Sequence, residues 1–178
     1  HDAHLEIQAS AVADGEAVRD FMLATPLVDS VGAALTAVKV SGEVRSDFQL
    51  NIPFDRRQGE PRAWGWADLN NNRVNIRAPE MQLDSTSGRI VFDNDVVKAK
   101  GLIAKLLDQS IRVDFRGESR KKGYEVAIDT SGDWEVKPLA KFVGSEWTSP
   151  LAGHAPWTMG VDIQLHSVGF TYQVDLST

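Results

Sequence analysis

The stretch Val40-Ser-Gly-Glu-Val-Arg-Ser-Asp-Phe-Gln-Leu-Asn-Ile-Pro-Phe54 alternates apolar and polar residues over its whole length. The pattern returns 111 positions later, counted from Gly42 to Gly153, in Leu151-Ala-Gly-His-Ala-Pro-Trp-Thr-Met-Gly-Val-Asp-Ile-Gln-Leu165. Because successive side chains of a strand point to opposite faces, each stretch predicts a long strand with one apolar and one polar face. A recurring unit of this kind indicates a slice of an array of repeats.

A short helix is predicted before each of these strands. Asp14 before the first strand and Asp133 before the second are good helix N-caps, and each has a glutamate two residues later, where it suits the helix dipole. Val18, Phe21 and Met22 are spaced to lie on one face of the first helix. The repeat divides the chain into the end of one unit at 1–38, a full unit at 39–150 and the start of another at 151–178.

Most of the remaining chain has the pattern of strands joined by turns. A second helix is expected at about 25–38, a turn at Asn70-Asn71-Asn72, and strands at 4–12, 63–69, 73–77, 88–92, 96–107, 110–117 and 124–130. Such a meander predicts a mainly β fold, an antiparallel sheet with one apolar face. The predicted helices are too few and too short to cover that face. The cover is therefore a second layer of strands, a partner or lipid.

Composition excludes several classes of protein. The chain has 178 residues, 42% of them hydrophobic, so it can bury a core and is not disordered throughout. The net charge of −6, without clustered Lys and Arg, argues against nucleic-acid binding. There are no cysteines, and the four histidines lack metal-binding spacing. We therefore expect no metal, no cofactor and no catalytic site. The chain lacks an initiating Met and is interpreted as a piece of a longer protein.

Three segments resemble a known family. The run from Leu83 to Phe115 contains Gly88-Arg-Ile-Val-Phe-Asp-Asn94, and this run is similar to the repeating block of the AsmA-like envelope proteins. The segment Trp66-Ala-Asp-Leu-Asn-Asn-Asn-Arg-Val-Asn-Ile76 and the Leu151-Ala-Gly start resemble the YhdP branch of that family. One departure is Gln109-Ser110, which stands where the family usually has Gly-x-Pro. The resemblance runs from about Val38 to the C-terminus.

The resemblance implies a fold, a location and a function. Family members are similar to bridge-like lipid transfer proteins, whose repeated β-groove units form a curved, taco-like sheet with an apolar channel. It implies a periplasmic protein, anchored in the inner membrane through a segment not present here, that carries phospholipids between the inner and outer membranes. The implied partners are phospholipid acyl chains, adjacent repeats of the same chain, and both membranes through parts outside this chain.

The alternation and the resemblance together select the residues expected to line this groove. The simpler interpretation of the same residues is that they form an ordinary closed core. The expected groove-lining residues are Val44, Phe48, Leu50, Ile52, Phe54, Val74, Ile76, Leu83, Ile90, Phe92, Ile111, Val113, Phe115, Tyr124, Val126 and Ile128.

Two other functions remain open from the sequence. The first is a structural or protein-binding β module of the cell envelope, which uses exposed strand edges to pair with neighbours. The second is a β-sandwich that binds glycan, because Trp64 and Trp66 share one face of a predicted strand and could stack on a sugar ring.

Overall fold

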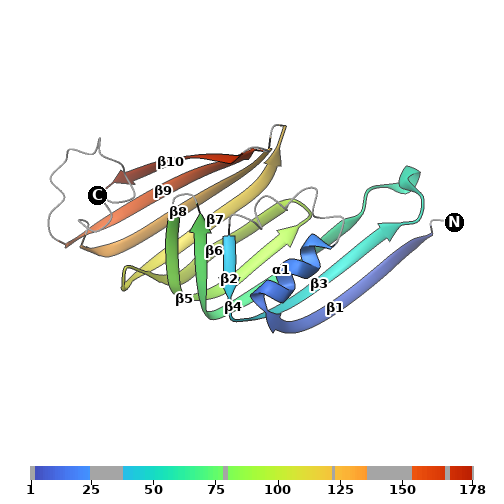
Figure 1. The fold of residues 1–178 in the computed structure, drawn as a ribbon, viewed down its shortest axis with the longest axis horizontal. Coiled ribbons are helices and arrows are strands. Elements are labelled where there is room, and N and C mark those ends of the chain that lie inside the picture. The colour runs from blue at the N-terminus through green and yellow to red at the C-terminus, as the bar shows by residue number, and fades with distance from the viewer. Residues whose placement is uncertain are drawn as a thin grey trace.

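The described residues form one antiparallel sheet of ten strands (Figure 1). The structure is a computed structural model, and it describes residues 3–24, 38–77, 80–121, 123–135, 154–166 and 169–177. The strands follow the order β1-β3-β4-β5-β6-β7-β8-β9-β10, and β2 pairs with β4 beside β3. The sheet is curved and does not close, so β1 and β10 form its two edges. The predicted mainly β, curved antiparallel sheet is therefore confirmed.

The secondary-structure elements are mostly long strands. Their bounds are β1 His4–Asp14, α1 Gly15–Leu23, β2 Val38–Ser41, β3 Glu43–Pro53, the 3-10 turn η1 Arg56–Gln58, β4 Arg62–Arg77, β5 Glu80–Asp93, β6 Val96–Leu106, β7 Gln109–Arg120, β8 Gly123–Glu135, β9 His154–His166 and β10 Gly169–Ser177. No second layer of strands lies among these elements, so the alternative of a β-sandwich is wrong for the described part of the chain.

Apolar residues of neighbouring strands lie opposite one another and define one face of the sheet, which we call the inner face. One row crosses nearly the whole sheet through direct partners: Ala9, Phe48, Gly65, Phe92, Val97, Gly117, Val126, Ile163 and Tyr172. A single core cluster joins buried residues from β3 to β10. Charged residues of the same strands lie on the opposite, outer face. The apolar alternation read from the sequence is therefore the inner face.

Bulges keep the apolar residues on the inner face where the alternation slips by one residue. Register shifts occur between β4 and β5, between β5 and β6, and between β6 and β7. Residues with positive φ lie at these places: Asn71 at 60°, Ser85 at 49° and Gly101 at 71°. In β4, β5 and β6, the residues whose side chains lie on the inner face have odd numbers before the bulge and even numbers after it. In β5, for example, Leu83 precedes the bulge and Ile90 follows it. Bulges of this kind increase the twist and bend of a sheet.

The predicted single strand from Val40 to Phe54 is divided at Gly42. Both pieces pair with the same strand, β4. β2 pairs with residues 73–76 and β3 pairs with residues 62–68, so the two pieces are in line and separated by a break. Gly42 has φ 95°, which favours glycine. The Asn72 side chain donates hydrogen bonds from Nδ2 to the carbonyls of Ser41 and Glu43, both at 3.0 Å, and so bridges the break.

The predicted turn at Asn70-Asn71-Asn72 is wrong. These residues form a bulge inside the single 16-residue strand β4. Asparagine tolerates the left-handed conformation, and this explains why a run typical of a turn fits inside a strand. The turn between β6 and β7 lies at Leu107-Asp108.

Helix α1 forms where the sequence predicts it. The Asp14 carboxylate accepts a hydrogen bond from the Glu16 backbone N–H at 3.0 Å, as expected of an N-cap. The helix lies against the inner face, because Phe21 contacts Phe48 with ring centroids 5.1 Å apart. Val18 and Met22 pack on the core cluster. Among the described residues, no helix has the length and apolar character needed to cross a membrane.

The corresponding helix after Asp133 does not begin where predicted. Residues 133–135 continue β8 and pair with residues 154–156 of β9, so Asp133 is not a helix N-cap. The strand pairing therefore overrides the local capping signal. The rest of that predicted helix and the helix expected at about 25–38 lie outside the described residues, apart from Val38, which begins β2.

We predict that Asn72→Ala destabilises the sheet by about 1–3 kcal/mol, because two carbonyls and the Asn70 backbone N–H lose their side-chain partner in a buried place. Urea unfolding measures the change. The control is Asn70→Ala, since the Asn70 side chain is exposed and its backbone N–H is unaffected. Equal stability of the Asn72 variant and the wild type would contradict this role.

Candidate functional site

The inner face is the candidate site, and it contains the residues selected from the sequence. All of them except Phe54 lie on strands with their side chains on this face. Phe54 follows the end of β3 and is 71% exposed. The buried members of the selected set are Val44, Leu50, Val74, Ile76, Leu83, Ile111, Val113, Tyr124, Val126 and Ile128.

Sequence reasoning missed the inner-face residues of β4 and β6 near the bulges. These are Ala63, Gly65, Ala67 and Leu69 of β4, and Val97, Ala99, Leu102, Ala104 and Leu106 of β6. In β6, Lys98 and Lys100 alternate with apolar residues before Gly101, and Lys105 follows the opposite phase. The alternation of lysines and apolar residues thus shifts by one position at Gly101, and this shift is the sequence signal that could have identified the inner-face residues of β6.

The inner face is open along only part of its width. Phe48, Ile90, Phe92, Val97 and Phe115 are partly exposed, and we call these five residues the open strip. The β3–β4, β5–β6 and β7–β8 connections lie at one rim of the sheet, which we call the η1 rim because η1 belongs to the β3–β4 connection. The open strip lies toward this rim. The half nearer the opposite rim is almost fully buried.

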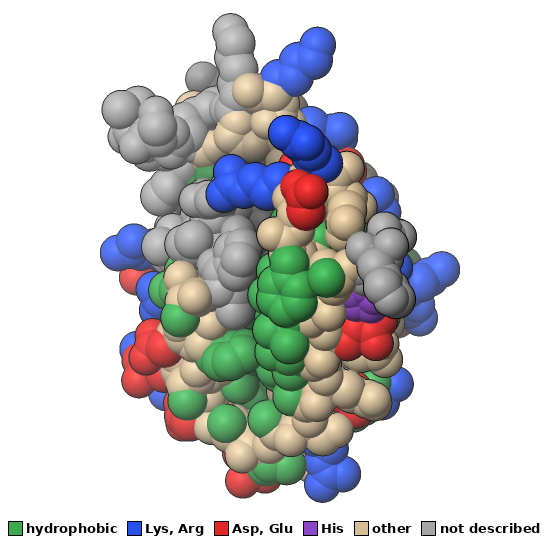
Figure 2. Space-filling model, turned by 90° about the vertical axis from the view of Figure 1, so that its right-hand side faces the viewer, with side chains coloured by type: hydrophobic (Ala, Val, Ile, Leu, Met, Phe, Trp, Pro, Cys, Tyr) green, Lys and Arg blue, Asp and Glu red, His purple; other side chains and the backbone are tan. Residues whose placement is uncertain are grey.

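The edge of the sheet at β1 and β3 is more exposed. Leu5 and Ile7 of β1 are 42% and 40% exposed, and they lie opposite Ile52 and Leu50. Figure 2 views this end of the molecule and shows hydrophobic side chains gathered in a continuous column with charged residues on its flanks. The apolar surface of the open strip therefore continues to the β1 edge.

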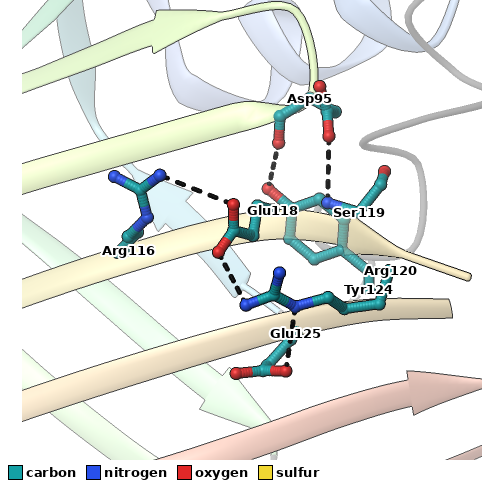
Figure 3. Close-up of polar contacts among 7 residues, drawn as sticks. All are labelled: Asp95, Arg116, Glu118, Ser119, Arg120, Tyr124 and Glu125. Carbon is teal, nitrogen blue, oxygen red and sulfur yellow. Dashed lines mark hydrogen bonds and ion pairs between the residues drawn. The ribbon is translucent and has the colours of Figure 1, made fainter.

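Tyr124 braces the inner face near the η1 rim (Figure 3). Its hydroxyl donates a hydrogen bond of 2.7 Å to the carbonyl of Asp95, two strands away in the β5–β6 turn. The ring passes over Gly117, where an added Cβ would lie 2.7 Å from the hydroxyl oxygen. Burial raises the pKa of Tyr124, and the nearby charges of Asp95 and Glu118 add to the shift. The hydroxyl therefore remains a donor at physiological pH.

A chain of ion pairs runs along the outer face beside this brace (Figure 3). Glu118 contacts Arg116 at 3.4 Å and Arg120 at 2.8 Å, and Arg120 contacts Glu125 at 3.2 Å. Asp95 accepts a hydrogen bond of 3.0 Å from the Ser119 backbone N–H. The arginine charges here are thus paired with carboxylates within the protein.

Trp64 and Trp66 lie on the outer face, away from the open strip. The Arg62 guanidinium lies 4.4 Å from the centroid of the Trp64 ring, and that of Arg89 lies 4.0 Å from the Trp66 ring. One face of each ring is therefore occupied by an arginine, in the stacked geometry of a cation–π contact. A glycan would have to compete with these guanidinium groups for that ring face.

The same arginines hold two carboxylates in ion pairs. Arg62 contacts Asp93 at 2.9 Å, and Arg89 contacts Asp68 at 2.7 Å. Hydrogen bonds from these guanidinium groups lower the pKa of Asp93 and of Asp68. These groups order the outer surface of β4 and β5.

We predict that Gly117→Ala costs about 1–3 kcal/mol of stability, because the new methyl group must displace the Tyr124 ring. Tyr124→Phe should cost about 1 kcal/mol through loss of the hydrogen bond to Asp95. Chemical denaturation measures both changes. In the double variant, the cost of removing the hydroxyl should shrink because the ring is already displaced. Strictly additive costs would contradict the proposed contact.

Comparison with known proteins places this sheet among relatives. The family model described as "YhdP protein" matches residues 1–178. The chain is 32% identical over 177 residues to the protein named "Intermembrane phospholipid transporter YhdP" of Escherichia coli (strain K12). That alignment covers 97% of this chain and 14% of the relative, so the chain spans about one seventh of that protein's length. No solved structure matches the chain.

Proposed function

The chain belongs to the YhdP protein family, and from this premise we propose that it is one segment of a periplasmic bridge that carries phospholipids between the inner and outer membranes. The acyl chains lie against the inner face of the sheet, and the headgroups remain at a rim in water. The segment acts without catalysis. The observation that supports this proposal is the continuous apolar inner face of an unclosed sheet, part of which is open to solvent.

The open strip has the chemistry that an acyl chain requires. Its five residues carry no polar side-chain atom, and three of them are phenylalanines. Burial of each methylene group in an apolar environment contributes about 0.8 kcal/mol. A lipid with two acyl chains would therefore gain enough free energy to leave water for this surface, after the entropy of ordering is subtracted.

Movement along the sheet requires neighbouring positions of similar affinity. A deep pocket would trap the lipid, whereas a row of equivalent strands lets it slide without returning to water. Gly65 lies between Phe48 and Phe92 in the row that crosses the strip, so the floor is low between the two rings. The repeated strand geometry thus supports transport better than storage.

The two free edges of the sheet supply a way to extend it. β1 and β10 each pair with one neighbour in the described sheet and leave their other side unpaired. Backbone groups along such an edge pair readily with a further strand. We propose that adjacent repeats of the same polypeptide bind there, with residues 39–150 as one full unit, 1–38 as the end of the preceding unit and 151–178 as the start of the next.

The same edges are the observation that favours a second candidate, a structural module that binds proteins by strand pairing. In that case the inner face is only a closed core, and lipid never contacts it. The two candidates differ in what lies against the open strip. A test of the proposal therefore has to compare the two faces of one strand.

Site-specific photocrosslinking in cells makes that comparison. A photoreactive residue at Phe48 or Val97 reports on the inner face, and one at Gln49 or Lys98 is its matched control, because the adjacent residue points to the outer face. We expect phospholipid adducts at the inner positions and far fewer at the outer positions, since the acyl chains are proposed to lie on the inner face alone.

Two outcomes would contradict the proposal. Equal adducts on both faces would indicate non-specific contact with membrane lipid. A folded protein without adducts at Phe48 and Val97 would favour the structural module, and crosslinks to protein at the β1 edge would then be expected.

A further inference from the structure

We propose that Arg56 and Arg57 form a phosphate-binding site at the η1 rim, which holds the headgroup of a phospholipid whose acyl chains lie on the adjacent inner face. This inference rests on the proposed lipid function and assigns the headgroup to one of the two rims. The site combines two adjacent unpaired cations with an exposed apolar surface.

The arginines of η1 differ from most others in the described part of the chain. Six arginines there contact carboxylates, namely Arg62, Arg73, Arg89, Arg112, Arg116 and Arg120. Arg56 and Arg57 are both exposed, and no carboxylate of the described residues lies within ion-pair distance of either. Both guanidinium groups are therefore available to an external anion.

Local structure fixes the backbone that carries these cations. The Asp55 carboxylate accepts a hydrogen bond of 3.0 Å from the Arg57 backbone N–H and caps the 3-10 turn. The Gln58 N–H donates to the Asp55 carbonyl at 2.9 Å. Asp55 is thus engaged in holding the turn, although its charge and that of the exposed Glu60 reduce the net charge of the loop. These two carboxylates balance the two arginine charges, so binding of a phosphate diester depends on direct contact with the guanidinium groups.

Apolar residues lie close to this site. Leu50 and Ile52 are the last inner-face residues of β3, and Phe54, which follows the strand, is 71% exposed and lies two residues before Arg56. On β1, Leu5 and Ile7 extend the same surface. Figure 2 shows Lys and Arg side chains, with acidic side chains beside them, above the upper end of the hydrophobic column.

The two chemistries together select a phospholipid as the occupant. An arginine guanidinium binds phosphate oxygens through paired N–H donors. Exposed phenylalanine, leucine and isoleucine bind acyl methylenes. A free phosphate ion would use only the arginines, and an uncharged diacylglycerol would use only the apolar surface. A phospholipid uses both.

The test compares two lipids with identical acyl chains on the full-length protein. Dioleoylphosphatidylglycerol and dioleoylglycerol compete for a fluorescent acyl-chain probe bound to the wild type, to the double variant Arg56→Gln with Arg57→Gln, and to Arg77→Gln. Arg77 is the control, because it is an exposed arginine at the end of β4 on the opposite rim and no carboxylate of the described residues forms an ion pair with it.

We expect the double variant to bind dioleoylphosphatidylglycerol about fivefold more weakly, since two exposed charge contacts are lost. Its affinity for dioleoylglycerol should not change, and Arg77→Gln should bind both lipids as the wild type does. A variant with Arg56→Lys and Arg57→Lys should retain most of the preference for the phospholipid. Inorganic phosphate at the lipid concentration should not displace the probe.

Other results would overturn the inference. An equal loss for both lipids, or no loss for either, would mean that the arginines do not read the phosphate. The same loss of affinity in Arg77→Gln would mean that the phosphate is not bound specifically at the η1 rim. Displacement of the probe by inorganic phosphate would indicate a site for anions in general. If neither lipid displaces the probe from the wild type, the proposed lipid function fails as well, which separates the two failures.

Discussion

The constraint on which the structure depends is the phase of its apolar side chains. A shift of one residue in a strand moves every side chain to the other face. Bulges at Asn71, Ser85 and Gly101 absorb such a shift in three successive strands, and Gly42 breaks the line of β2 and β3 next to them. The inner face therefore stays mostly apolar from β1 to β10, with Ser46, Asn72, Thr86 and Thr130 as its buried polar residues, and the bulges also help to bend the sheet around that face.

A bent sheet with one apolar face is stable in water only if most of that face is covered by other apolar groups. Much of it is buried within the chain, and the open strip remains toward the η1 rim. Gly65 keeps the floor low between Phe48 and Phe92, and the Tyr124 ring crosses Gly117 to hold the rim to the β5–β6 turn. Rigid packing on one side and an accessible apolar surface on the other support the proposed conduit, in which a lipid would slide along a folded scaffold.

Much of the fold and of the inner face could be predicted from the sequence. Alternation in Val40–Phe54 and Leu151–Leu165 identified the inner face correctly, because strand periodicity depends only on local geometry. Bulges are less predictable, since the Asn70-Asn71-Asn72 run is typical of a turn until Asn72 is seen to bond the carbonyls of Ser41 and Glu43. Asp133 misled for a similar reason, because a capping residue was outweighed by pairing between β8 and β9. The free arginines of η1 are visible only once the pairing of the others is known.

The central claim is that acyl chains lie on the inner face and not on the outer one. Methyl NMR of the protein with a phospholipid that carries a nitroxide on its acyl chain tests this claim most directly. The account predicts strong paramagnetic broadening of the Ile90 and Val97 methyl signals on the inner face. The Val91 and Ile103 methyl groups, which are 43% and 55% exposed on the outer face, should keep sharp signals. Broadening of Val91 and Ile103 equal to or greater than that of Ile90 and Val97 would contradict the account.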